Sequence, residues 1–118
     1  MDDPRLPPRI EVSGWIRRAE ARGGGGMVLH KGDPDAGTIL LVSLENNGTM
    51  DPPALLWERL PQPDGQRVWT VTRVQDPENK HEFNDYIAQR TGRDPDLWVV
   101  ELTVANPQQF VGNPGTSG

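Results

Sequence analysis

The segment Leu97–Val104 constrains the fold most, because it combines two patterns typical of the interior of a sheet. Leu97 to Val100 is an unbroken apolar run, which indicates a strand covered on both faces. From Trp98 onward the apolar residues alternate, so the second half of the strand is expected to be covered on one face only. We therefore predict a central strand here, and we expect Asp94 and Asp96 to shape the turn before it.

Four further strands are expected earlier in the chain. Thr38–Leu44 is also apolar on both faces and predicts a second central strand. The other three are predicted at Met27–Lys31, Ala54–Leu60 and Gln66–Val74. The last two are joined by Pro61-Gln62-Pro63-Asp64-Gly65, a strong turn signal that predicts a hairpin.

Two helices are predicted from apolar stripes at helical spacing. The first stripe consists of Val12, Trp15, Ile16 and Ala19, and its helix is expected to end at the glycine run Gly23–Gly26. The second helix is expected to begin with Asp76 as N-cap and Pro77 as its first residue. Its buried stripe is predicted to be Phe83, Tyr86 and Ile87, and its end Thr91-Gly92.

The predicted fold class is α+β, in the order α-β-β-β-β-α-β. Sequential hairpins favour a mostly antiparallel five-stranded sheet, and the final strand–helix–strand return permits one parallel pairing through a right-handed crossover. We expect both helices to pack on one face of the sheet. Residues 1–9 are expected to be an extended or disordered arm, 10–104 a single globular domain, and 105–118 a mostly disordered tail.

Composition limits the classes of function. The 118 residues include no cysteine, which excludes disulfides and thiolate sites, and only two histidines, so no zinc site is expected. The net charge of −5 argues against nonspecific nucleic-acid binding, which would need one stripe formed from the N-terminal arginines Arg5, Arg9, Arg17, Arg18 and Arg22. Without a signal peptide or a membrane-spanning apolar run, the protein is expected to be cytoplasmic.

Several segments together resemble domain-of-unknown-function family 1491, a family of small bacterial proteins. The resemblance covers about residues 10–104 and departs at the proline-rich start and at the loop Asn46–Pro53. It implies a bacterial cytosolic protein and no particular activity. It is carried by Trp15-Ile16-Arg17-Arg18, the glycine run, Lys31-Gly32-Asp33-Pro34-Asp35-Ala36-Gly37, Trp57-Glu58-Arg59-Leu60-Pro61-Gln62-Pro63-Asp64-Gly65 and Asp94-Pro95-Asp96-Leu97-Trp98-Val99-Val100-Glu101.

The predicted hairpin carries the candidate binding residues Trp57, Arg59, Arg67 and Trp69. A five-residue loop at Pro61–Gly65 would pair Leu60 with Gln66, so that Trp57 lies opposite Trp69 and Arg59 opposite Arg67. A register shifted by two residues would keep both tryptophans on one face. Two indoles beside two guanidiniums would suit an anionic or aromatic ligand. In the alternative interpretation both tryptophans are core residues, with the arginine stems at its edge.

Other candidate chemistry is weaker. Glu58 lies among leucines on the opposite face of its strand, where a raised pKa would suit a general base, although an ion pair with an arginine is the more common arrangement. The carboxylates of Asp33, Asp35, Asp94 and Asp96 would suit a hard cation if they converged, but both Asp-Pro-Asp sequences are better explained as turn and capping residues. We predict no metal site and no cofactor.

Two functional hypotheses from different classes follow. The first is a non-enzymatic protein-binding or assembly module that uses a sheet edge or the Trp57/Trp69/Arg59/Arg67 face, with self-association as a dimer as one form. The alternative is a small enzyme or ligand-binding domain for an anionic metabolite, using Glu58, Arg59 and Arg67. No nucleophile–base arrangement supports catalysis in the sequence.

Overall fold

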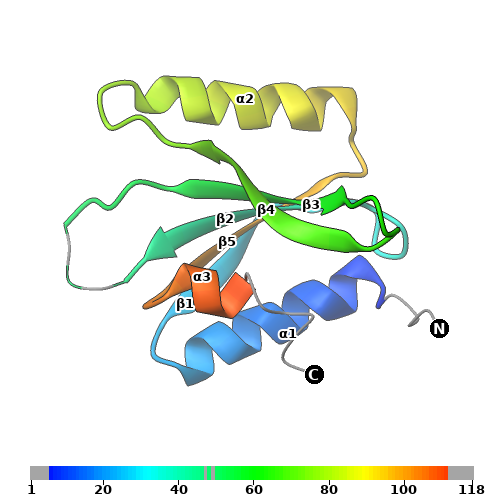
Figure 1. The fold of residues 1–118 in the computed structure, drawn as a ribbon, viewed down its shortest axis with the longest axis horizontal. Helices are drawn as coiled ribbons and strands as arrows, with labels where there is room; N and C mark the ends of the chain where they lie inside the picture. Colours follow the sequence, from blue (N-terminus) through cyan, green and yellow to red (C-terminus); the bar gives the residue numbers. More distant parts are fainter. Residues whose placement is uncertain (1–5, 47, 49, 112–118) are drawn as a thin grey trace.

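A computed structural model describes residues 6–46, 48 and 50–111 of the chain (Figure 1). The predicted order of elements is confirmed, and a short third helix follows the last strand. The helices are α1 (Pro8–Ala21), α2 (Lys80–Arg93) and α3 (Pro107–Val111). The strands are β1 (Gly25–His30), β2 (Ile39–Glu45), β3 (Leu55–Pro61), β4 (Arg67–Val74) and β5 (Trp98–Val104).

The five strands form one mixed sheet in the order β1-β5-β2-β3-β4. The last strand in sequence, β5, lies between β1 and β2 and runs parallel to β2, with Ile39 opposite Trp98. The other three pairings are antiparallel. The predicted α+β class, the mostly antiparallel sheet and the interior position of both doubly apolar segments are therefore confirmed.

The helices lie on opposite faces of the sheet, so the expectation that both pack on one face was wrong (Figure 1). On one face, Trp15 of α1 and Phe110 of α3 join a core that includes Trp98 and Val100. On the other face, Phe83 of α2 packs in a core with Leu97 and Val99. The physical reason is in the sequence of β5 itself, because a strand that is apolar on both faces needs a cover on each.

The glycine run ends α1 and brings it close to the sheet. Gly23 has φ +86°, and it donates its N–H to Glu20 O, while Gly24 donates to Ala19 O. This pair of bonds is a Schellman motif, so the predicted C-cap is confirmed. A Cβ at Gly24 would lie 1.9 Å from the carbonyl oxygen of Thr103 in β5. The run is therefore required by packing as well as by the turn.

The start of α2 differs from the prediction. Asp76 and Pro77 belong to a turn in which the Asp76 carboxylate accepts the N–H of Glu78, and the helix begins at Lys80 with Asn79 as its N-cap residue. The Asp76 carboxylate therefore accepts a backbone N–H of the turn and not one of the first turn of the helix, which is a common alternative role of aspartate.

The hairpin between β3 and β4 has the register shifted by two residues from the expected one. Arg59 lies opposite Trp69 and Pro61 opposite Arg67, so Leu60 does not pair with Gln66. The turn explains the shift. Gly65 (φ +88°) donates its N–H to Gln62 O, which places Pro63 at the second position of the turn, where its fixed φ is favourable.

The segment after β5 is partly ordered, whereas the whole of 105–118 was expected to be mostly disordered. Residues 107–111 form α3, and Phe110 and Val111 are buried against the α1 side of the sheet. Residues 112–118, and residues 1–5 of the predicted arm, lie outside the described residues. No helix within the described part of the chain has the length and apolar character needed to span a bilayer.

Candidate functional site

Trp57 and Trp69 are core residues. Both are buried on the α1 side of the sheet, as the alternative interpretation of the hairpin predicted. The Trp57 indole donates its Nε1–H to the buried Ser43 hydroxyl at 2.8 Å, and the Trp69 ring lies edge-on to Trp15 with centroids 5.3 Å apart. The two indoles therefore hold α1 and the sheet together and do not form an exposed stacking surface.

Arg59 connects β3 to the first turn of α1. Its guanidinium donates from both terminal nitrogens to the two carboxylate oxygens of Glu11, at 3.0 and 3.1 Å. The same guanidinium lies over the Trp69 ring, 4.6 Å from the centroid. A bidentate ion pair combined with stacking fixes the position of a side chain that is otherwise flexible.

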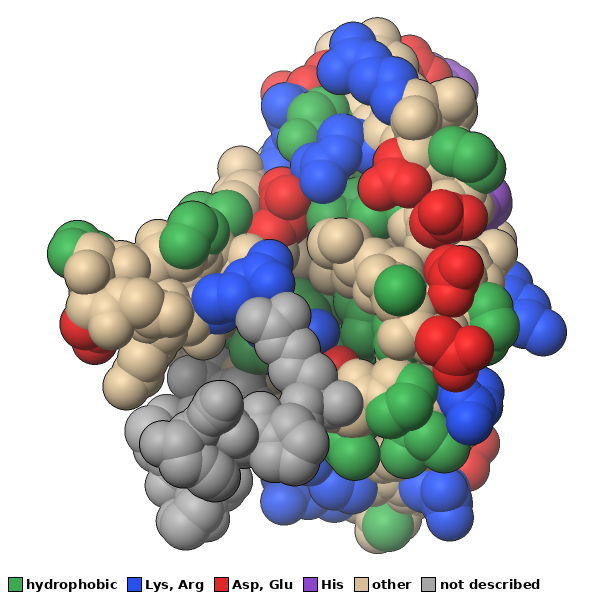
Figure 2. Space-filling model, turned by 90° about the vertical axis from the view of Figure 1, so that its right-hand side faces the viewer, with side chains coloured by type: hydrophobic (Ala, Val, Ile, Leu, Met, Phe, Trp, Pro, Cys, Tyr) green, Lys and Arg blue, Asp and Glu red, His purple; other side chains and the backbone are tan. Residues whose placement is uncertain are grey.

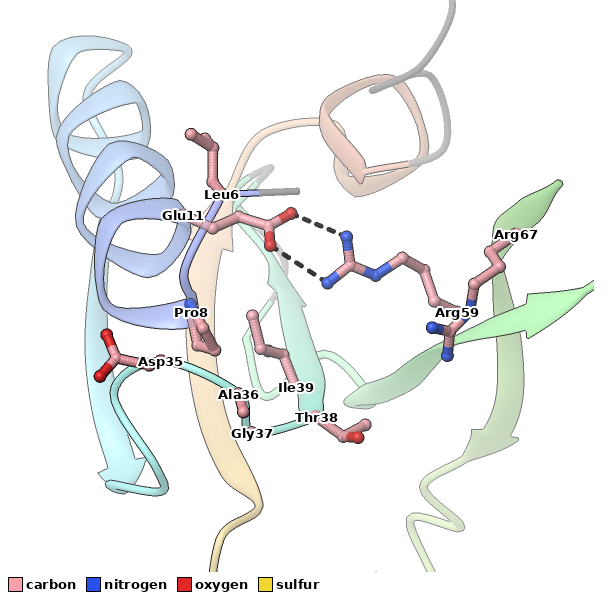
Figure 3. A pocket seen from close by; sticks show the side chains of 10 residues that line it. All are labelled: Leu6, Pro8, Glu11, Asp35, Ala36, Gly37, Thr38, Ile39, Arg59 and Arg67. Atoms are coloured by element: carbon pink, nitrogen blue, oxygen red, sulfur yellow. Dashed lines mark hydrogen bonds and ion pairs between the residues drawn. The ribbon is translucent and has the colours of Figure 1, made fainter. Parts of the chain in front are cut away.

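A cleft of about 310 Å³ lies between the start of α1, the loop before β2 and the β3–β4 hairpin (Figure 3). Arg59 reaches across it to Glu11, and Arg67 of β4 lies beside Arg59 (Figure 3). The Arg67 side chain is exposed and forms no ion pair or hydrogen bond with another described residue. Figure 2, which views the molecule from the right-hand side of Figure 1, shows a hollow with hydrophobic, basic and acidic side chains at its border. The two arginines predicted from the hairpin thus share one cleft.

Glu58 lies away from this cleft, on the α2 side of the sheet. Its carboxylate accepts hydrogen bonds from Arg90 at 3.0 Å and from the Thr72 hydroxyl at 2.7 Å. Burial lowers the pKa of Arg90, but its hydrogen bonds to Tyr86 and Glu58, together with its charge interactions with both groups, outweigh burial, so the net shift is upward. Glu58 therefore has the ion-pair partner that its sequence context suggested, and it does not join Arg59 and Arg67 in one site.

The predicted aspartates lie in two loops that meet at one end of the sheet. Asp33 donates its N–H to Asp96 O, and its carbonyl accepts the Nε1–H of Trp98 at 2.7 Å. The Asp33 carboxylate accepts two amide hydrogens of its own loop, and Asp35 forms an ion pair with Arg9. Within the described residues, no three acidic or histidine side chains are placed to hold a metal ion.

The N-terminal arginines do not form one free stripe. Arg9 is paired with Asp35, while Arg18 and Arg22 lie over the Phe110 ring, with their guanidinium carbons 4.7 and 5.5 Å from its centroid. Arg17 is exposed, and Arg5 lies outside the described residues. Two of these arginines thus cover α3. This role could not be predicted from the sequence, because α3 itself was not predicted.

The free edge of β1 is a feature that the sequence did not single out. Met27, Val28 and Leu29 are 52%, 41% and 49% exposed, and among the described strands β1 pairs with a neighbour on one side only. The strand Gly25–His30 contains no charged residue and no proline. A sheet edge was predicted as a binding surface, but the sequence did not show which strand forms it. β1 lies at the edge because β5 pairs between β1 and β2.

The chain is similar to one family and to several solved structures. The family model described as "Protein of unknown function (DUF1491)" matches residues 6–112. A crystal structure of a DUF1491 family protein from Caulobacter crescentus CB15 is 30% identical, with a TM-score of 0.74, and the match covers 90% of this chain and 94% of that one. An NMR structure of a DUF1491 family protein from the same organism is 29% identical, with a TM-score of 0.72 and coverage of 92% and 94%.

A more distant relative has the same fold. The solution structure of protein Atu0922 from A. tumefaciens is 25% identical, with a TM-score of 0.68, and the match covers 92% of this chain and 94% of that one. No curated protein matches the chain significantly. The comparisons therefore support the fold along nearly the whole chain and assign no activity.

Proposed function

Because the chain belongs to the DUF1491 family of proteins of unknown function, we propose a function from the geometry of its surface: a protein-binding module whose partner adds a strand to β1. The observation that carries this proposal is the uncharged, apolar and exposed edge formed by Met27, Val28 and Leu29. The proposed setting is the cytoplasm of a bacterium, and the two organisms of the relatives named above are in line with the bacterial part of this proposal.

The two edges of the sheet differ in their protection. An edge strand exposes unpaired backbone N–H and C=O groups, and proteins usually guard such edges with charges, prolines or bulges. The β4 edge carries Arg67 and Arg73, and Arg73 is ion-paired to Glu82 of α2. The β1 edge carries neither charge nor proline, and its one bulge, between Val28 and His30, leaves residues 25–28 regular. Strand addition is therefore favoured at β1.

A second copy of the chain is the partner that fits this edge most simply. Two β1 strands related by a two-fold axis would pair antiparallel and join the sheets of both copies into one. The segment Gly25–His30 has no charge, so its self-pairing brings no like charges together. Met27 and Val28 point to opposite faces of the sheet, so each copy would cover apolar area on both faces of the other.

The test is the mass in solution of three proteins, measured by light scattering from micromolar to near-millimolar concentration. The wild type is expected to dimerise. Met27→Lys is expected to be monomeric, because a lysine on the edge opposes strand addition, while Glu101, opposite Met27 on β5, can accept the new charge within the fold. The matched control is Val68→Lys on the other edge strand, where Val68 is 42% exposed. The control should dimerise like the wild type.

Two results would contradict the proposal. A wild type that stays monomeric over the whole concentration range would rule out self-pairing at β1. A dimer that Met27→Lys leaves intact would place the interface elsewhere on the molecule.

A further inference from the structure

We propose that the cleft containing Arg59 and Arg67 binds a small oxoanion, carried by a short carboxylic acid or by a phosphate. The inference concerns a different surface from β1 and does not depend on self-association. It rests on the charge balance of the cleft, on the fixed position of Arg59, and on the size and lining of the cavity.

Among the described residues that line the cleft, one cation has no acidic partner. Four charged side chains line the cleft, and two of them, Arg59 and Glu11, neutralise each other. Asp35 is paired with Arg9, which does not line the cleft. Arg67 is the fourth, and it contacts no acidic group among the described residues although the whole chain has a net charge of −5. An anion would therefore complete the cleft electrostatically.

Arg59 is held in a position that can support a second contact to the same anion. Its two terminal nitrogens each donate one hydrogen bond to Glu11, which leaves part of the five-donor guanidinium unused. Stacking on Trp69 restricts the plane of the guanidinium. The hydroxyl of Thr38 also lines the cleft and has no partner within the described chain. Within the described residues, the cleft thus combines two guanidiniums with a hydroxyl that has no partner.

The size and the remaining lining limit the ligand to a small one. A volume of about 310 Å³ is at the lower end of the range for small-molecule sites. Pro8, Ala36 and Ile39 supply apolar contacts on the side away from the hairpin (Figure 3). A short carbon chain bearing an oxoanion group would use both the apolar and the basic parts of this lining.

Glu11 would act as an internal competitor for the ligand. Its carboxylate occupies the face of Arg59 that a ligand carboxylate would otherwise use in the same bidentate geometry. Glu11→Gln keeps the side-chain length, removes the negative charge and frees the terminal nitrogens of Arg59 for a ligand, while stacking on Trp69 still restricts the guanidinium. The variant should therefore bind an added anion more tightly than the wild type does.

The experiment is a calorimetric and NMR titration with two separate probes, succinate and inorganic phosphate, at constant ionic strength. Binding of the wild type to at least one probe is expected, and the probe that binds more tightly identifies the source of the oxoanion. Arg67→Gln should weaken binding about tenfold or more, because a charge-assisted hydrogen bond is lost. Glu11→Gln should strengthen binding by several-fold. Arg93→Gln, an equal loss of charge at an exposed position in the last turn of α2, should leave affinity unchanged.

The proposal fails if neither probe binds the wild type. It also fails if Arg67→Gln and Arg93→Gln weaken binding equally, because the anion would then respond only to net charge. Met27→Lys should bind the probes like the wild type, so loss of the dimer and loss of the anion site are distinguishable.

Discussion

At the scale of single residues, Gly24 shows how closely the end of α1 approaches the sheet. A Cβ on Gly24 would lie 1.9 Å from the backbone oxygen of Thr103, whereas a Cβ on Gly25 would meet nothing within 4 Å. A backbone oxygen on an interior strand cannot move aside in the way that the end of a flexible side chain can. The two adjacent glycines therefore have unequal structural roles, although the sequence presents them as one run.

We predict that Gly24→Ala lowers the free energy of unfolding by about 2–4 kcal/mol, because α1 must move away from β5 to admit the methyl group. Gly25→Ala is the matched control, and its effect should stay within about 0.5 kcal/mol. Urea denaturation of both variants measures the difference. Equal midpoints for the two would contradict the close approach of Gly24 to Thr103.

The candidate site was predictable only in part, and its residues show why. Alternation along the hairpin correctly placed Trp57 and Trp69 on one face, because side-chain direction has a period of two in any strand. The partner of Arg59 is Glu11, 48 positions away in sequence, and no local pattern relates the two. Likewise, the separation of Glu58 from the cleft depends on Arg90 of α2 lying across the other face.

At the scale of secondary-structure elements, the two long helices are attached unequally. Four residues of α1 are buried, namely Pro8, Val12, Trp15 and Ala19. In α2, which has the same length, only Phe83 is buried, and Tyr86 and Ile87 are partly covered. The free energy that holds a surface helix comes mainly from its buried apolar face, so α2 is the more weakly held of the two.

We expect the backbone amides of α2 to exchange hydrogen through a local opening that costs less free energy than global unfolding. Amides of β2, β5 and the centre of α1 should exchange near the global value, and α1 serves as the internal control. Native-state hydrogen exchange at increasing denaturant measures the opening free energies of α2 and of these core elements. A single opening free energy shared by α2 and β5 would show that α2 unfolds only with the whole domain.

The elements themselves were largely predictable, but their placement was not. β-branched and apolar residues between turn signals predicted each strand, and the apolar stripe and terminal glycines of α1 predicted that helix. The start of α2 was misplaced because Asp76-Pro77 suits a turn as well as an N-cap. The single-face arrangement of the helices was wrong because it left one apolar face of β5 without a cover. Periodicity shows that both faces of β5 are apolar, but it does not say which helix covers which face.

At the scale of the whole molecule, the distribution of charge bears on assembly. A chain of net charge −5 repels its copies in general, so a surface free of charge favours association. β1 is such a surface, and the lysine-free, proline-free segment 25–30 is therefore where copies would meet.

We predict that the thermal unfolding midpoint of the wild type rises with protein concentration, because pairing at β1 stabilises only the folded state. The midpoint of Met27→Lys should not depend on concentration, while that of Val68→Lys should follow the wild type. Differential scanning calorimetry over a wide concentration range measures this dependence. A wild-type midpoint independent of concentration would argue against a dimer that is coupled to stability.

The position of β5 also has a consequence for how the chain is made. The strand that lies between β1 and β2 is the last of the five to be synthesised. Its partner β2 precedes it by some 60 positions in the register Ile39–Trp98, and β1 precedes it by more, in the register Gly25–Thr103. Until β5 leaves the ribosome, β1 has no neighbour in the sheet and one edge of β2 stays open. Such non-local pairing delays folding and exposes apolar strands on the nascent chain. Translation must therefore proceed beyond Val104 before the sheet can close.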